Sequence, residues 1–148
     1  MKAGAYVSTT LDADVDTAWS VVHDFHGMPA WTPRVRASLA ECGSGAAAVG
    51  SIRCLTLAPD GRQVRERLVD HDTTDRRYSY EFVGTIPYPV TSYRGTIHLL
   101  PITETGATFL EWSGAFDAEP AQVESLRVRF AAVYTAFIAD LRAHLATR

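Results

Sequence analysis

The sequence has little cysteine, little net charge and no long apolar run. Its 148 residues include two cysteines, Cys42 and Cys54, and carry a net charge of −3 without long runs of either sign. Both cysteines fall in predicted strands, so we expect buried free thiols and no disulfide framework. The charge distribution gives no support for binding nucleic acid or anionic membranes, and we expect no nucleic-acid partner.

Targeting and membrane-spanning patterns are also missing. The first residues lack the apolar core of a secretory signal. No apolar stretch approaches the roughly 20 residues that span a bilayer. We therefore expect a cytoplasmic protein without membrane insertion. A chain of this length with 47% hydrophobic residues can bury one core, which predicts a single domain over residues 1–148.

Alternating apolar and polar residues mark seven segments as strands. The connections between consecutive strands after the first are short, which predicts an antiparallel meander. The predicted strands are Tyr6–Leu11, Val35–Glu41, Gly50–Leu57, Gln63–Asp70, Arg77–Val83, Thr91–Leu100 and Thr108–Asp117.

Two short helices are expected after the first strand. Apolar residues recur at helical spacing between Val15 and Phe25, and Asp12 or Asp14 can cap this helix. Gly27 ends it and leaves room for a short second helix around Pro29–Trp31.

A long apolar stripe predicts a C-terminal helix from about Glu119 to Thr147, with Asp117 as its N-cap and Pro120 in its first turn. The stripe must lie against the sheet; it comprises Val123, Leu126, Phe130, Val133, Tyr134, Phe137, Leu141 and Leu145. The order of elements predicts an α+β fold in which a curved antiparallel sheet wraps around one long helix and encloses a pocket.

Strand alternation places one carboxylate on the inner surface. We assign Val64, Glu66 and Leu68 inward, because the opposite assignment buries two arginines. Arg53 is then a plausible cross-strand partner for Glu66. The pair is open to two interpretations, a structural ion pair at a barrel mouth or a polar anchor for a ligand.

Glycines also fall on the helix-facing side. Gly95 and Gly114 remove side-chain volume where the sheet should pack, which favours either a cavity or tight bending of the strands.

With the residues laid out in this way, the chain resembles the START-like, or SRPBCC, superfamily with its helix-grip fold. It looks most like the bacterial polyketide cyclase/dehydrase branch and more distantly like plant abscisic-acid receptors and Bet v 1 proteins. The resemblance covers essentially the whole chain and rests on the order and spacing of these segments: Asp12 with Ala18 and Trp19, 24–31, 49–53, 65–68, 75–78, 93–97 and 111–113.

The resemblance implies seven antiparallel strands that grip the C-terminal helix and leave a tunnel-like pocket. The loops Pro59–Gly61 and Thr85–Val90, with Tyr88 in the latter, would form its gate. Its lining would comprise Trp31, Thr32, Arg53, Leu55, Glu66, Tyr80, Tyr93, Trp112, Phe130 and Tyr134. Thr32 departs from the family pattern, because the receptors place a lysine there, so a salt bridge from this position to a ligand carboxylate is not expected.

Two classes of function remain open. As an enzyme, the chain would cyclise or aromatise a polyketide-like substrate, with Glu66 as the base and Arg53, Tyr93 and Tyr134 as hydrogen-bond donors to a developing enolate. As a binding protein, it would carry or sense a lipid or another apolar ligand, or serve as a lipid-using stress chaperone. In both cases the partner is a hydrophobic small molecule, and a homodimer is left open.

Cofactor and metal sites are not expected. His23 and His26 stand three residues apart, but no third ligand is spaced to join them. The sequence carries no Ser-His-Asp set, phosphate loop or dinucleotide fingerprint.

Overall fold

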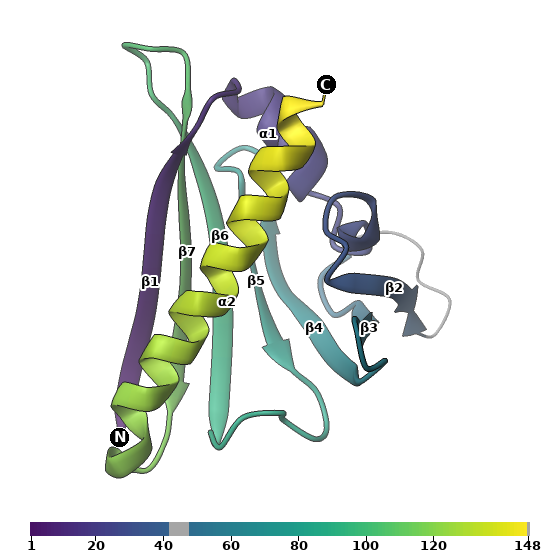
Figure 1. Cartoon of the computed structure of the whole chain (residues 1–148), viewed down its shortest axis with the longest axis vertical. Helices are drawn as coiled ribbons and strands as arrows, with labels where there is room; N and C mark the ends of the chain where they lie inside the picture. The colour runs from purple at the N-terminus through teal and green to yellow at the C-terminus, as the bar shows by residue number, and fades with distance from the viewer. Residues whose placement is uncertain (42–47, 148) are drawn as a thin grey trace.

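The computed structural model describes residues 1–41 and 48–147 (Figure 1). Seven strands form one antiparallel sheet in the order β1-β7-β6-β5-β4-β3-β2. The strands are β1 (Lys2–Leu11), β2 (Val35–Ala40), β3 (Ile52–Leu57), β4 (Gln63–Asp72), β5 (Arg77–Phe82), β6 (Ser92–Pro101) and β7 (Thr108–Asp117). The helices are α1 (Val15–Val22), a single 3-10 turn η1 (Met28–Ala30) and α2 (Pro120–Ala146). The predicted helix-grip fold is confirmed.

Helix α2 crosses one face of the curved sheet and packs mainly against β1 and β7 (Figure 1). Its C-terminal end lies at the end of the molecule opposite the N-terminus. The predicted stripe is buried at Val123, Leu126, Phe130, Tyr134 and Leu141, together with Ile138. Val133 and Phe137 are only partly buried, because they lie where the helix faces the more distant strands.

Local capping explains where α1 begins. Asp14 is the N-cap, and its carboxylate accepts a hydrogen bond from the Thr17 N–H at 2.7 Å. This bond satisfies one of the backbone donors that the first helical turn leaves without a partner. Of the two predicted candidates, Asp14 and not Asp12 therefore starts the helix.

The prediction that Asp117 caps the C-terminal helix is wrong. Asp117 ends β7, and its Oδ1 accepts a hydrogen bond from the Met1 amine at 2.7 Å. Strands β1 and β7 pair along their whole length with Lys2 opposite Asp117, which brings the amine to this carboxylate. The N-cap of α2 is Glu119, whose side chain makes no capping hydrogen bond.

Three further predictions are revised. Strand β1 begins at Lys2 and not at Tyr6. The second short helix is one 3-10 turn at Met28–Ala30. Cys54 is a free thiol on β3 but is only partly buried. Cys42 and the predicted turn that follows it lie outside the described residues.

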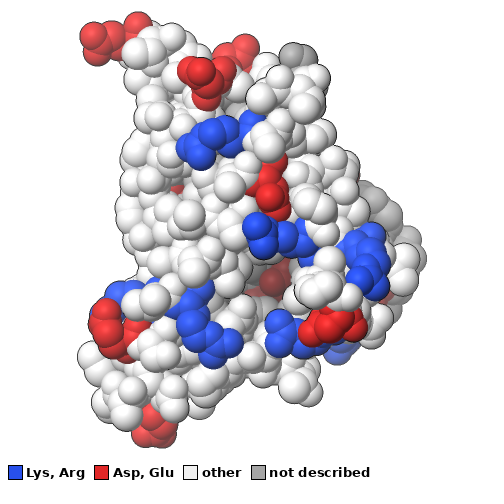
Figure 2. All heavy atoms as spheres, in the orientation of Figure 1, with Lys and Arg blue, Asp and Glu red and all other residues white. Residues whose placement is uncertain are grey.

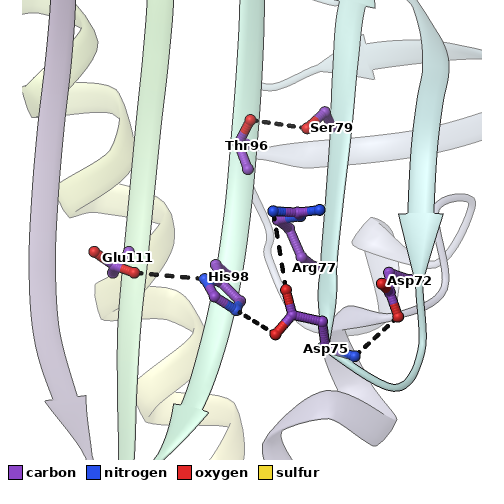
Figure 3. A network of polar contacts seen from close by, with 7 residues as sticks. All are labelled: Asp72, Asp75, Arg77, Ser79, Thr96, His98 and Glu111. Carbon is purple, nitrogen blue, oxygen red and sulfur yellow. Dashed lines mark hydrogen bonds and ion pairs between the residues drawn. The ribbon is translucent and has the colours of Figure 1, made fainter.

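The sheet face away from α2 carries polar pairs between neighbouring strands (Figure 3). His98 on β6 lies 3.3 Å from Asp75 Oδ1 and 3.5 Å from Glu111 Oε1. On the same face, the Ser79 and Thr96 hydroxyls are 2.8 Å apart across β5 and β6. His98 therefore lies on the outer face of the sheet, within ion-pair distance of two carboxylates.

Two facing glycines give tyrosine side chains a place against the inner face of the sheet. Gly95 and Gly114 are directly opposite each other on β6 and β7. A Cβ on Gly114 would stand 2.1 Å from Tyr134 Oη, and a Cβ on Gly95 would stand 2.3 Å from Tyr80 Cζ. The volume that these glycines leave is therefore occupied by phenol rings and is not part of an open cavity.

We expect Gly114→Ala to lower the free energy of unfolding by roughly 1–3 kcal/mol, as overpacking of a dense core does. Urea unfolding of the variant measures this cost. In a Tyr134→Phe background the cost should shrink, because the hydroxyl is the atom nearest to the new methyl group. Gly4→Ala is the matched control, since its Cβ would meet only the Gly114 carbonyl oxygen at 3.4 Å. Equal costs at Gly4 and Gly114 would contradict the packing argument.

Candidate functional site

A cavity of about 430 Å³ lies between the middle of α2 and the inner face of β3, β4 and β5. Figure 2 shows the hollow on this face, with acidic atoms in its depth and basic side chains around it. Its volume falls within the range of small-molecule sites. The described lining residues are Arg34, Leu55, Leu57, Ala58, Arg62, Val64, Glu66, Tyr80, Phe82, Pro87, Tyr88, Tyr93, Phe130, Ala132, Val133, Tyr134, Ala136 and Phe137.

Glu66 is the one carboxylate among these lining residues, and Arg53 lies behind it. The two residues are directly opposite each other on β3 and β4. Arg53 Nε and Nη2 lie 2.8 and 2.7 Å from the same oxygen, Glu66 Oε1. The side chains are 2% and 9% exposed, so both charges are almost entirely removed from bulk water.

The remaining contacts of Arg53 are also within the protein. Its Nη1 donates to the Phe25 carbonyl oxygen at 2.7 Å. The guanidinium carbon lies 4.0 Å from the centroid of the Phe25 ring, a cation–π contact. Arg53 is therefore held as a structural partner that fixes the Glu66 carboxylate, whose face toward the cavity is left for a ligand.

Three phenols, from β5, β6 and α2, add further polar groups to the lining. The hydroxyls of Tyr93 and Tyr134 are hydrogen-bonded to each other. The Trp112 indole N–H donates to Tyr80 Oη at 3.0 Å. Burial raises the pKa of Tyr80, Tyr93 and Tyr134 well above the usual phenol value. These hydroxyls are consequently protonated at neutral pH and can donate hydrogen bonds.

Seven of the eleven predicted site residues meet in this cavity: Leu55, Glu66, Tyr80, Tyr88, Tyr93, Phe130 and Tyr134. Arg53, Trp31, Thr32 and Trp112 are not among its described lining residues. Their side chains lie behind the lining residues, and their contact with a ligand stays a prediction.

Trp112, Trp31 and Thr32 each have a packing or hydrogen-bonding partner that keeps them behind the cavity wall. Trp112 stacks on Tyr134 and on Phe137, with ring centroids 5.6 Å apart in both pairs. Trp31 packs edge-on against Phe137. The Thr32 hydroxyl donates to Asp140 Oδ2 at 2.7 Å, so it is engaged with α2 and not with the cavity.

Some lining residues were not predicted as site residues. Val64 and Phe82 lie on strand faces that alternation already assigned, and Phe137 belongs to the predicted helical stripe. Arg34 and Arg62 had no such signal, because residues outside strands and helices have no periodicity that assigns them a face. The described residues offer no candidate metal site, because they contain no group of three or more His, Cys, Asp or Glu side chains placed to hold an ion.

The sequence and the structure identify the family. Residues 2–146 match the family described as polyketide cyclase / dehydrase and lipid transport. The chain belongs to this family. No curated protein matches the sequence significantly.

None of the described helices is both long enough and apolar enough to cross a membrane.

Solved structures share the fold over nearly the full chain. A protein from Nitrosospira multiformis is 29% identical, with a TM-score of 0.80 and coverage of 97% of this chain and 96% of that one. Major latex-like protein 151 of Panax ginseng is 19% identical, with a TM-score of 0.78 and 97% of each chain covered. A point mutant of norcoclaurine synthase from Thalictrum flavum, in complex with a transition-state analogue, is 20% identical, with a TM-score of 0.76, covering 99% of this chain and 96% of that one. Family and fold together support binding of a hydrophobic small molecule.

We expect Arg53→Met to lower the free energy of unfolding by about 3–5 kcal/mol, because it leaves the buried Glu66 charge without its partner. The double variant Arg53→Met with Glu66→Leu should be clearly more stable than Arg53→Met alone. Urea unfolding at neutral pH measures both.

The matched control is Arg67→Met, on the outer face of β4. Arg67 pairs with Glu81 at 3.0 Å, but these side chains are 42% and 37% exposed. Exposed pairs contribute at most about 1 kcal/mol, so this variant should change stability little. A similar loss of unfolding free energy for Arg53→Met and Arg67→Met would show that burial of the Arg53–Glu66 pair does not make it more important for stability than an exposed pair.

Proposed function

We propose that this protein binds an apolar, ring-containing small molecule in the cavity between α2 and strands β3 to β5. The observation that carries the proposal is a hollow of about 430 Å³ whose walls are mostly aromatic and aliphatic. Apolar pockets of this size with a few fixed polar groups are typical ligand sites.

The polar groups of the cavity define what the ligand must offer. Glu66 can accept a hydrogen bond from a ligand hydroxyl or amine. Tyr80, and whichever of Tyr93 and Tyr134 accepts the hydrogen bond between them, can donate to a ligand oxygen. A fully saturated hydrocarbon would leave the cavity side of Glu66 and these phenol protons without partners, at a cost in affinity. The favoured ligand is therefore an oxygenated ring compound, held by a carrier or sensor.

Filling the cavity should abolish binding without unfolding the protein. Ala136 on α2 lines the cavity, whereas Ala139 on the same helix is exposed to solvent. We expect Ala136→Trp to weaken binding of the neutral fluorescent probe N-phenyl-1-naphthylamine at least about tenfold, because the indole occupies the space that the probe needs.

Fluorescence titration measures this binding, and Ala139→Trp is the matched control that should bind the probe within about twofold of the native chain. Circular dichroism establishes that both variants are folded. Equal binding by the native chain and a folded Ala136→Trp variant would place the probe elsewhere and overturn the proposal for this cavity.

Ring-forming catalysis is the second candidate, and the buried phenols favour it. Bound in a folded conformation, a poly-β-ketone would lose a proton from a methyl or methylene carbon to Glu66. The resulting enolate carbon would attack a ketone in the same molecule, forming one carbon–carbon bond and an alkoxide that takes the proton back from Glu66. Loss of this hydroxyl group and a neighbouring hydrogen as one water would complete the ring. The Tyr93 and Tyr134 hydroxyls are hydrogen-bonded to each other, so one proton of the pair would be free to donate to the developing oxyanion. Arg53 would act only through Glu66, as a positioning residue.

The ion pair weighs against this second candidate. A proton on Glu66 would cancel its negative charge and leave the buried Arg53 guanidinium hydrogen-bonded to the neutral Phe25 carbonyl oxygen but without its carboxylate partner. An uncompensated buried charge is costly. For this reason we place ligand binding first and cyclisation second.

Cyclisation can be tested with 1-phenylhexane-1,3,5-trione, whose ring closure with loss of water gives 5-phenylresorcinol. If the protein catalyses this reaction, Glu66→Gln and Tyr93→Phe should each slow turnover about 10²-fold or more, while probe affinity stays within several-fold. Product formation by liquid chromatography is the measurement. Rates equal to that of the uncatalysed solution, or unchanged in both variants, would leave binding as the function.

A further inference from the structure

Arginines surround the mouth of the cavity, and the carboxylates of the described residues balance only part of their positive charge. Arg34 and Arg62 line the cavity, and the Arg129 guanidinium lies 4.9 Å from the centroid of the Tyr88 ring, which also lines it. All three arginines are exposed. Figure 2 shows basic side chains around the hollow.

The three arginines differ in how they are paired. Arg34 Nε forms an ion pair with Asp140 Oδ2 at 3.0 Å. Among the residues that the structure describes, Arg62 and Arg129 form no ion pair. The nearby Asp60 carboxylate accepts a hydrogen bond from the Arg62 backbone N–H, at 3.0 Å, and not from its guanidinium. Two guanidinium groups at the mouth are therefore available to a ligand.

The Tyr88 hydroxyl provides an independent indication that both cations are close to the mouth. Burial raises the pKa of Tyr88, and the charges of Arg129 and Arg62 partly oppose this shift. Arg62 comes from the loop between β3 and β4, and Arg129 comes from α2. Tyr88 is therefore close to both cations.

The charges are arranged with opposite sign in the depth and at the mouth. The depth holds Glu66, whose charge is already paired with Arg53, so this end of the cavity offers no free cation to an anionic group. The mouth offers guanidinium forks, which suit carboxylate, sulfonate and phosphate oxygens. An amphiphile with one anionic end can satisfy both regions only with its apolar body inside and its anionic end at the mouth.

We propose that the ligand of this cavity is an amphiphile whose terminal oxyanion is held at the mouth by Arg62 and Arg129 while its apolar body lies against the aromatic walls. This inference rests on the proposed binding function and adds the charge class and the orientation of the ligand. Arg34, already engaged by Asp140, contributes a weaker attraction at the same edge.

A matched pair of fluorescent probes tests the inference. 8-Anilinonaphthalene-1-sulfonate has the ring body of N-phenyl-1-naphthylamine with one added sulfonate. For the double variant Arg62→Gln with Arg129→Gln, we expect the affinity for the sulfonate probe to fall about tenfold, because two charge-assisted contacts are lost. The affinity for the neutral probe should fall by a clearly smaller factor, because this probe has no anionic group for the guanidinium groups to hold.

The matched control is the double variant Arg77→Gln with Arg94→Gln, which removes the same charge from β5 and β6 away from the cavity lining. It should bind both probes as the native chain does. Added sodium chloride should weaken only the sulfonate probe. Inorganic phosphate at equal ionic strength should displace that probe no more than sodium chloride does, because an anion without an apolar body makes only the contacts at the mouth.

The outcomes separate this inference from the function on which it rests. If the native chain binds neither probe, the proposed binding function fails and the inference fails with it. If the neutral probe binds but the sulfonate probe is insensitive to Arg62→Gln with Arg129→Gln, only the inference is overturned. A stronger displacement by phosphate than by sodium chloride would indicate a site for a free anion and would likewise overturn it.

Discussion

The cavity depends on where α2 meets the sheet. The helix packs mainly on β1 and β7, and the curvature of the sheet carries β3, β4 and β5 away from it. Phenol rings fill the near side, where Gly95 and Gly114 allow Tyr80 and Tyr134 to approach the backbone. On the far side no comparable layer fills the space, and a cavity of about 430 Å³ is left.

The Arg53–Glu66 pair links this geometry to chemistry. A lone carboxylate at the wall of an apolar cavity would be costly, and the guanidinium behind it makes the charge tolerable. The same contact limits what Glu66 can do, because its Oε1 is occupied by two Arg53 nitrogens. The site therefore favours recognition of a hydrogen-bond donor over repeated proton transfer.

Periodicity in the sequence predicted the fold and the direction of most inner side chains. Alternation placed Glu66 on the inner face, where it lines the cavity. Alternation could not predict how far a side chain lies from the cavity. Trp112 lies behind the cavity wall because Tyr134 and Phe137 stack in front of it. Nor could it foresee contacts across the sheet between distant segments, such as the Met1 amine that engages Asp117. Arg34 and Arg62 at the mouth were missed because residues of loops follow no period.

The place of Trp112 has a spectroscopic consequence. Its indole touches the back of two rings, Tyr134 and Phe137, whose front faces line the cavity. Trp31 also packs against Phe137, while Trp19 lies near His71, among residues that do not line it. Occupancy of the hollow should therefore be transmitted through one aromatic layer to two of the three indoles. The protein thus carries its own optical reporter, and intrinsic emission can follow an unlabelled, non-fluorescent compound as it enters.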